Sequence, residues 1–282
     1  MERTGIFFHY QEGERLRDFP QALGEVLTQD NVFLYDALYP SKPSSPFDLE
    51  PVPLDLMRAV HSEGMIERVR KAGAFEGALF SASSTVAAAT RIWNDEVDNA
   101  FVFTGYGDHH AGRNSFGGGC YFNGAAMAIR MLQREHRAER FAILDTDAHH
   151  GDGTWDIFAQ DSQVLYACLC RGSNQDVNNK VNIHVDHEIS DKAYVDLIRE
   201  RFIPRVKDFQ PEIIFWNWGY DGTRGDYGSL GLTPEVHASI AHELKLLSEK
   251  VCKGRLVVVL CGGSRRDLAR FLIPQIIQVL VS

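Results

Sequence analysis

One segment of the 282-residue chain, Asp145–Thr154, places five ionisable side chains within eight consecutive positions. It reads Asp-Thr-Asp-Ala-His-His-Gly-Asp-Gly-Thr and directly follows the apolar run 141–144. A buried strand that ends in such a cluster brings its polar side chains to the carboxyl edge of a sheet, where open α/β folds place their active sites. A solvated acidic turn is the alternative, and the number of ionisable groups after an apolar strand argues against it. The segment therefore predicts an α/β fold with a functional site at this strand end.

The rest of the chain alternates short apolar runs with longer amphipathic stretches. This alternation predicts βαβ units and a mostly parallel central sheet with helices on both faces, a three-layer α/β/α fold. No repeat or linker interrupts it, so we expect one domain over residues 1–282. The proline-rich segment 39–53 is expected to be a surface loop, either a plain connector or the rim of a cleft. The expected strands are 5–9, 101–105, 141–145, 164–170, 212–218 and 256–261, and the expected helices are 55–72, 78–94, 123–139, 191–208, 234–253 and 266–281.

Composition narrows the classes of partner. A net charge of −9 argues against nucleic-acid binding, which normally needs a basic face. The five cysteines are odd in number and mostly lie in apolar runs, which indicates reduced thiols in an intracellular protein. The Cys168-Leu169-Cys170 spacing is not that of a zinc ribbon and by itself requires no metal. With no long apolar segment, we expect a cytoplasmic protein without a membrane partner.

Polar residues follow the expected strands where each one ends. His109 follows the strand 101–105, Asp221 follows 212–218, and a Gly-Gly-Ser-Arg turn follows 256–261. Asp147, His149 and Asp221 together form an oxygen–nitrogen metal site that keeps one coordination position open, which is typical of catalytic metals. A metal there activates water and polarises a substrate carbonyl.

The histidines beside this site complete a plausible hydrolytic set. His109 and His110 can act as general base and general acid if their protonation states differ. Asp145 and Asp152 are available to accept the second ring N–H of each histidine. The arrangement predicts hydrolysis of an amide.

These motifs resemble the zinc-dependent histone deacetylase superfamily, including bacterial and archaeal acetoin-utilisation and acetylpolyamine deacetylase-like proteins. The resemblance begins at 9–16 (His-Tyr-Gln-Glu-Gly-Glu-Arg-Leu), continues through 60–66 and reaches the C-terminal Gly-Gly turn. Segment 145–154 is nearly the family signature. The resemblance implies an arginase-like three-layer α/β/α fold with a mostly parallel sheet.

The resemblance also implies the role of each site residue. Zinc would be held by Asp147, His149 and Asp221, although the sequence does not distinguish zinc from iron. The catalytic pair would be His109 and His110, supported by Asp145 and Asp152 respectively. A structural potassium ion would lie around Asp145, Asp147 and His149. The related arginase branch needs extra carboxylates for a second metal where this chain has Gly151 and Thr223, which argues against a ureohydrolase.

Three departures from the family concern substrate binding. Ser264 stands where the family has an oxyanion-binding Tyr, and loss of one such donor typically costs about 100- to 1,000-fold in rate. Gly119, with Phe116 before it, replaces an aromatic tunnel wall, and loop 171–176 is polar. We therefore expect a wider mouth and name Gly119, Phe116, Gly263, Ser264 and Arg265 as candidate substrate-binding residues. Arg265, Tyr10, Tyr220 and Tyr227 are the candidates to replace the missing donor.

We accordingly predict a zinc-dependent deacetylase that removes an acyl group from an acetyl-lysine-like or small acetylated amine. Its partners would be an acylated small molecule or lysine, with no nucleic acid and no membrane. The alternative is a degenerate, non-catalytic family member that binds zinc and an acylated ligand or partner. The absent Tyr favours the alternative, whereas the complete histidine–carboxylate set favours the enzyme.

Overall fold

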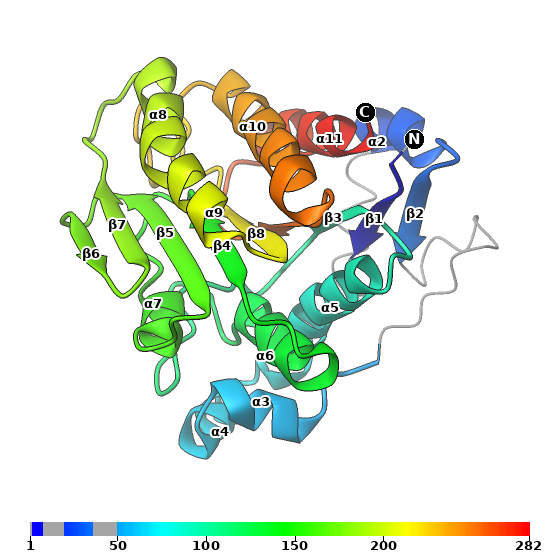
Figure 1. The fold of residues 1–282 in the computed structure, drawn as a ribbon, viewed down its shortest axis with the longest axis vertical. Helices are drawn as coiled ribbons and strands as arrows, with labels where there is room; N and C mark the ends of the chain where they lie inside the picture. Colours follow the sequence, from blue (N-terminus) through cyan, green and yellow to red (C-terminus); the bar gives the residue numbers. More distant parts are fainter. Residues whose placement is uncertain (1, 8–19, 36–49) are drawn as a thin grey trace.

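A nine-stranded sheet forms the centre of the computed structural model, which describes residues 2–7, 20–35 and 50–282 (Figure 1). The strand order is β2-β1-β3-β9-β8-β4-β5-β7-β6, and every pair is parallel except β6 and β7. The expected opening motif at 9–16, with Tyr10, and the proline-rich segment up to 49 lie outside the described residues. The strands are β1 (Thr4–Phe7), β2 (Val32–Tyr35), β3 (Asn99–Val102), β4 (Phe141–Asp145), β5 (Val164–Cys170), β6 (Gln175–Val177), β7 (Lys180–His184), β8 (Ile213–Trp218) and β9 (Leu256–Leu260).

Helices cover both faces of the sheet, so the predicted three-layer α/β/α architecture is confirmed (Figure 1). One layer contains α2 (Pro20–Leu27), α8 (Asp191–Leu197), a π-helical turn (Ile198–Phe202), α9 (Ile203–Phe209), α10 (Glu235–Cys252) and α11 (Arg266–Val281). The other contains α3 (Leu54–Val60), α4 (Glu63–Lys71), α5 (Phe75–Trp93), α6 (Gly124–His136) and α7 (Asp152–Phe158).

Strand β8 shows why the sheet needs both helical layers. Trp216 and Trp218 face the apolar cluster that contains α10 and α11, whereas Phe215 faces the cluster that contains α5 and α6. All six residues of the strand are buried. A strand that is apolar on both faces is stable only between two layers, which is why parallel sheets read as continuous apolar runs.

The expected helix 55–72 is wrong, because the chain leaves the helix at His61 and Ser62 and forms α3 and α4 instead. His61 is fully buried, and its Nδ1 hydrogen-bonds the Gly112 carbonyl at 2.8 Å. Its Nε2 accepts a hydrogen bond from the Asn123 amide at 3.1 Å. Ser62 Oγ then caps the first turn of α4. The break is therefore fixed by the hydrogen bonds of His61 to two distant loops and by the Ser62 cap.

The expected helix 191–208 is likewise interrupted, by the π-helical turn before α9. Pro204 lies in the first turn of α9, where its missing N–H removes a hydrogen bond from a continuous helix.

The sequence analysis missed the strands β2, β6 and β7, and β7 has an identifiable physical reason. It contains Lys180, a residue seldom buried, yet Lys180 is 1% exposed. Its ammonium donates hydrogen bonds to the carbonyls of Asp161, Val164 and Asn178 at 2.7–2.8 Å. Three carbonyl acceptors satisfy the three donors of the ammonium, so a strand that looks polar in sequence can lie inside the sheet.

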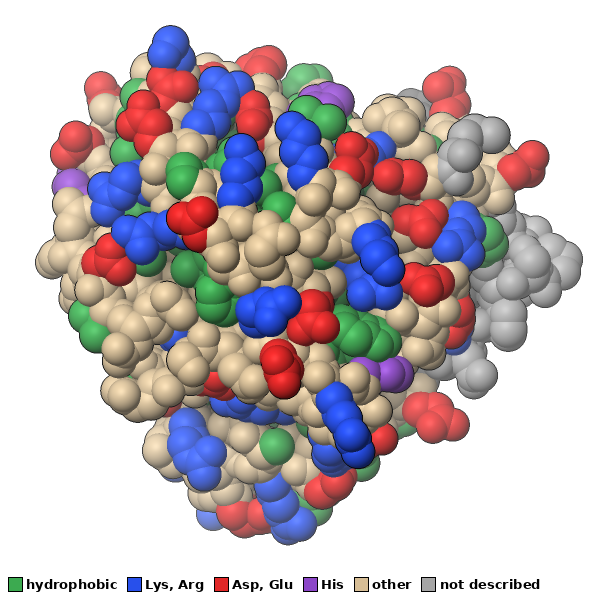
Figure 2. Space-filling view, viewed as in Figure 1, with side chains coloured by type: hydrophobic (Ala, Val, Ile, Leu, Met, Phe, Trp, Pro, Cys, Tyr) green, Lys and Arg blue, Asp and Glu red, His purple; other side chains and the backbone are tan. Residues whose placement is uncertain are grey.

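The molecular surface carries both signs of charge. Figure 2 shows Lys and Arg side chains interspersed with Asp and Glu over the face in view. None of the helices in the described part of the chain is long and apolar enough to cross a membrane.

Buried His237 on α10 should make stability depend on pH. It accepts a hydrogen bond from Trp218 Nε1 at 3.0 Å, and burial lowers its pKa to about 4. Because an unfolded histidine has a pKa near 6.5, stability should be lost as pH falls below that value, by about 2 kcal/mol at pH 5 from this one group. We expect the free energy of unfolding in urea to fall less between pH 7 and pH 5 in His237→Gln than in the natural protein. Exposed His242→Gln is the control and should keep the original pH dependence; an unchanged dependence in His237→Gln would contradict the assignment.

Candidate active site

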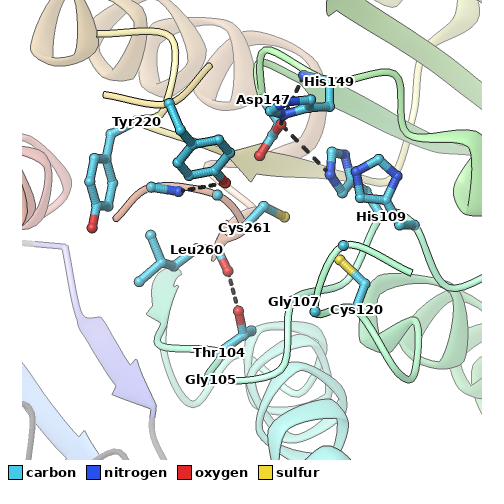
Figure 3. Close-up of a pocket in the computed structure, with 16 residues that line it drawn as sticks. Thr104, Gly105, Gly107, His109, Cys120, Asp147, His149, Tyr220, Leu260 and Cys261 are labelled. Atoms are coloured by element: carbon cyan, nitrogen blue, oxygen red, sulfur yellow. Dashed lines mark hydrogen bonds and ion pairs between the residues drawn. The ribbon is translucent and has the colours of Figure 1, made fainter. Parts of the chain in front are cut away.

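Four neighbouring strands, β3, β9, β8 and β4, end at one cavity of about 350 Å³. Because they are parallel, their carboxyl ends meet at the same edge, as expected for open α/β folds. The segments that follow them supply the lining. In Figure 3 Asp147, His149 and His109 face one another at one part of this cavity, while Thr104 and Leu260 lie at another.

The predicted metal ligands are brought together. Ligand atoms of Asp147, His149 and Asp221 all lie within 4.8 Å of one another. His149 Nδ1 is 3.0 Å from Asp147 Oδ1 and 2.9 Å from Asp221 Oδ2. Both carboxylates are buried, whereas the imidazole is partly exposed to the cavity.

The donor set fits a zinc-class cation. Asp221 Oδ1 accepts the Ala148 amide at 3.1 Å, but the buried Oδ2 accepts no hydrogen bond from any described residue, because its contact with His149 lacks hydrogen-bond geometry. A buried carboxylate oxygen without a donor is costly unless a cation binds it. Two carboxylates and one imidazole are oxygen and nitrogen ligands that zinc accepts.

The electrostatics of the group agree with this interpretation. Burial raises the pKa of Asp221 to about 6, with the nearby Asp147 charge adding to the effect. The hydrogen bond to Asp147 and the close contact with the Asp221 carboxylate raise the pKa of His149 to about 10. Without a cation, the imidazole must be protonated to balance the two carboxylates. A divalent cation can take over that role and leave the imidazole neutral for ligation.

His109 and Asp145 form a buried pair beside the metal ligands. His109 Nδ1 donates to Asp145 Oδ2 at 3.0 Å, and Tyr166 Oη donates to the same oxygen at 2.8 Å. His109 Nε2 is 3.8 Å from Asp147 Oδ1. Burial lowers the pKa of His109, but the charges of Asp145 and Asp147 outweigh it and raise the pKa well above the usual value.

His110 and Asp152 form a second pair, at the rim of the cavity. His110 Nδ1 donates to Asp152 Oδ1 at 2.6 Å, and Asp152 begins helix α7. The two histidine rings lie 4.1 Å apart. Partial burial, followed by the neighbouring His109, lowers the pKa of His110. The adjacent histidines thus have pKa values shifted in opposite directions.

Tyr227 contributes a phenol to the cavity. Its ring stacks on the His149 ring with 5.4 Å between centroids, and its Oη accepts a hydrogen bond from the Gly263 amide at 3.3 Å. A Cβ added at Gly262 would lie 2.1 Å from Asp147 Oδ2 and 3.0 Å from Tyr227 Oη. The phenol oxygen therefore lies close to the carboxylate of a predicted ligand. Tyr220 also lines the cavity, packed against the turn at Gly263.

The predicted substrate-binding residues are divided between this cavity and its surroundings. Gly119 and Gly263 line it. Phe116 lies in an adjacent hollow beside His110 and Asp152, and its ring packs on Tyr121. Ser264 and Arg265 are not among the lining residues: Ser264 Oγ donates to Asp226 at 2.7 Å, and the Arg265 guanidinium pairs with Asp267.

Three supporting residues escaped the sequence analysis. Tyr166 donates a hydrogen bond to Asp145, and Asp226 accepts hydrogen bonds from the turn after β9. His61 hydrogen-bonds the backbone at Gly112 and Asn123. Each acts through a tertiary hydrogen bond to a distant segment. The signal for Asp226 was its position five residues after Asp221 in a polar turn, and His61 lies in the segment 60–66 that carries the resemblance.

Comparison with known proteins agrees with this geometry. The histone deacetylase domain matches residues 67–279. A probable deacetylase of Archaeoglobus fulgidus is 35% identical over 205 residues, which cover 68% of this chain and 57% of that protein. Histone deacetylase 6 of Caenorhabditis elegans is 31% identical over 185 residues, 58% of this chain and 19% of that protein. The crystal structure of the HDA15 HD domain has a similar fold, with a TM-score of 0.82 at 22% identity, covering 100% of this chain and 90% of that chain.

The chain belongs to the histone deacetylase family, and its fold is the α/β fold of that family. The matched region spans only 57% of the archaeal relative and about a fifth of the nematode protein.

The ligand assignment predicts the outcome of a metal analysis. Asp221→Ala should contain one equivalent of zinc less than the natural protein, because a single carboxylate and an imidazole are too few ligands for tight binding. Plasma mass spectrometry of the zinc-loaded, dialysed proteins measures this. Asp152→Asn is the matched control and should keep its zinc, since Asp152 contacts His110 rather than the ligand group. Equal zinc in Asp221→Ala and the natural protein would rule the assignment out.

Proposed function

We propose that this chain is a zinc-dependent deacetylase that hydrolyses the amide of an acylated amine, either a small acetylated amine or an acetyl-lysine-like group. One observation carries the proposal: the Asp147–His149–Asp221 group and both histidine–carboxylate pairs lie at one cavity. Family membership supports it, since relatives bear the name deacetylase.

Asp147, His149 and Asp221 would hold one catalytic zinc ion. When bound, zinc supplies Lewis acidity, which polarises the amide carbonyl and lowers the pKa of a water molecule. Potassium around Asp145, Asp147 and His149 remains a prediction.

The histidines would divide the proton transfers between them. His110, with its lowered pKa, is the neutral imidazole suited to accept a proton from the attacking water. His109, with its raised pKa, is the cationic imidazole suited to donate a proton to the departing amine nitrogen. Asp145 and Asp152 bind the Nδ1 atoms, so both Nε2 atoms remain free for the transfers.

Tyr227 would supply the oxyanion donor that Ser264 cannot. Its hydroxyl lies at the cavity near Asp147, whereas the Ser264 hydroxyl is directed to Asp226. Burial and the charges of Asp221 and Asp147 raise the pKa of Tyr227, so the phenol keeps its proton and can donate it to a developing oxyanion. Arg265 is a weaker candidate, because its guanidinium is paired with Asp267 at the surface.

The mouth of the cavity is open on one side, so it would make few contacts with the substrate there. A Cβ at Gly119 would meet nothing within 4 Å, so this side of the mouth is open. At Gly118, by contrast, a Cβ would lie 2.6 Å from the His110 ring. The backbone at Gly118 therefore packs against the catalytic histidine, and the open space for a substrate lies beside Gly119. We propose an acylated small molecule or lysine as the partner, without nucleic acid or membrane.

The non-catalytic alternative is less well supported. A protein that only bound zinc and a ligand would gain nothing from two histidines whose pKa values are shifted apart by separate carboxylates. A panel of acylated amines, incubated with the zinc-loaded protein, tests the proposal. No turnover of any of them with zinc bound would favour the alternative.

His110→Ala should lower kcat by about 100- to 10,000-fold, the usual contribution of a general acid or base, while zinc content stays unchanged. Amine release measures the rate, and plasma mass spectrometry measures the zinc. His187→Ala, an exposed histidine outside the cavity, should retain full activity. Full activity in His110→Ala would instead assign the pair a structural role.

Tyr227→Phe should lower kcat for acetamides by about 100- to 1,000-fold, because it removes one oxyanion donor. The loss should be smaller for trifluoroacetyl amides, whose oxyanion is less basic and needs less stabilisation. The ratio of the two rates in each protein is the measurement. Tyr121→Phe, outside the cavity lining, is the matched control. An unchanged ratio in Tyr227→Phe would mean that the phenol does not bind the oxyanion.

A further inference from the structure

A second group of metal-type donors lies beside the active site. Ligand atoms of His150, Cys168 and Cys170 all lie within 4.8 Å of one another. The cysteines are two residues apart on β5, so their side chains leave the same face of the strand. His150 reaches them from the segment that follows β4. Both thiols are fully buried, and the imidazole is half-buried.

This group is separate from the proposed catalytic site. The His149 ring stacks on Tyr227 at the cavity, whereas the His150 ring packs on Trp155 of α7, with 5.4 Å between centroids in each case. Consecutive histidines thus point to different sides of the chain. Neither cysteine nor His150 lines the catalytic cavity. The two sites also differ in chemistry, since the catalytic ligands contain no sulfur.

Asn182 holds two of the three donors in place. It lies opposite Cys168 in the register of β5 and β7. Its Oδ1 accepts hydrogen bonds from the Cys170 thiol and from His150 Nδ1, each at 3.1 Å. Asn182 Oδ1 therefore holds the Cys170 sulfur and the His150 nitrogen close to each other. When the thiol proton leaves and the imidazole proton is on Nε2, this oxygen loses both donors and becomes a free fourth ligand.

The surroundings favour a charged sulfur at Cys170. The Gly172 amide donates to Cys170 Sγ at 3.4 Å, and His150 Nδ1 lies 3.8 Å from it. The thiolate, rather than the thiol, is the form of cysteine that binds metals.

Charge balance favours a divalent cation. Two thiolates neutralise a 2+ charge, so the filled site would be neutral overall and could remain buried without a large desolvation cost. Thiolate sulfur and imidazole nitrogen are the ligands that zinc-class and softer cations prefer.

We propose that Cys168, Cys170 and His150 form a second metal site, selective for a thiophilic divalent cation such as Zn²⁺ or Cd²⁺. Binding forms two metal–sulfur bonds and one metal–nitrogen bond and releases the two thiol protons to solvent. Asn182 Oδ1 is positioned to complete four ligands. The Cys-x-Cys spacing alone does not indicate a metal site, because His150 and Asn182 come from segments distant from β5 in the sequence.

Cadmium titration tests the site independently of catalysis. Thiolate ligation produces a sulfur-to-metal charge-transfer band in the ultraviolet, which oxygen and nitrogen ligands do not. We expect the band in the natural protein and in Asp221→Ala, and its loss when Cys168→Ser and Cys170→Ser are combined. Cys252→Ser, a buried cysteine elsewhere, should keep the band. Absence of the band from the natural protein, or its retention in the double variant, would overturn the proposal.

A second measurement needs no variant and so does not depend on whether the double variant folds. X-ray absorption of the natural protein, saturated with zinc, should show sulfur neighbours at about 2.3 Å as well as nitrogen and oxygen neighbours. Only nitrogen and oxygen neighbours at saturation would exclude the sulfur site. Since neither readout involves substrate, failure of the proposed deacetylase activity would leave this inference intact.

Discussion

The pairing of β4 with β8 is the constraint on which the site depends. Asp145 and Asn217 lie opposite each other in the pairing of β4 and β8. The segments that follow these two strands therefore begin side by side. The Thr146 amide donates to the Asn217 carbonyl at 3.0 Å and continues the pairing beyond β4. As a result, the next carboxylates of the two segments, Asp147 and Asp221, are buried against the same imidazole. Ligand oxygens of these two buried carboxylates lie within 4.8 Å of each other. Two like charges so close are unfavourable unless a cation or a proton lies between them.

The turns around these carboxylates contain glycine because the carboxylates occupy the space a side chain would need. A Cβ at Gly228 would lie 2.3 Å from Asp221 Oδ2, and one at Gly262 would lie 2.1 Å from Asp147 Oδ2. Both distances are far below van der Waals contact. Gly262 in the turn after β9 thus has a steric origin in the proposed ligand group, whereas a Cβ at Gly263 would lie 2.3 Å from the Tyr220 ring.

Sequence patterns predicted the parts of the molecule that depend on local periodicity and spacing. Strands β4 and β5 were found at their observed bounds, because both faces of each are apolar. The proposed ligand group follows from the spacing of Asp147 and His149 plus one carboxylate at another strand end. Strand β7 was missed because the buried ammonium of Lys180 is satisfied only by carbonyls from other segments. The break at His61 was missed for the same reason, since its partners belong to distant loops.

The choice among candidate oxyanion donors also required tertiary contacts, and Asp226 shows why. Its carboxylate accepts the amides of Ser264 and Arg265 at 3.0–3.3 Å and the Ser264 hydroxyl at 2.7 Å. It also accepts the adjacent Tyr227 amide at 2.7 Å. One carboxylate therefore joins the turn after β9 to the loop that carries the phenol.

This junction relates the small residue at 264 to the aromatic residue at 227. A serine hydroxyl is short enough to hydrogen-bond the carboxylate that its own amide contacts, whereas a tyrosine hydroxyl at 264 would lie too far from the backbone to do so. Ser264 thereby holds Asp226 in place, and the residue after Asp226, Tyr227, stacks on His149. Ser264 thus anchors the loop at Asp226, and Tyr227 of the same loop lines the cavity.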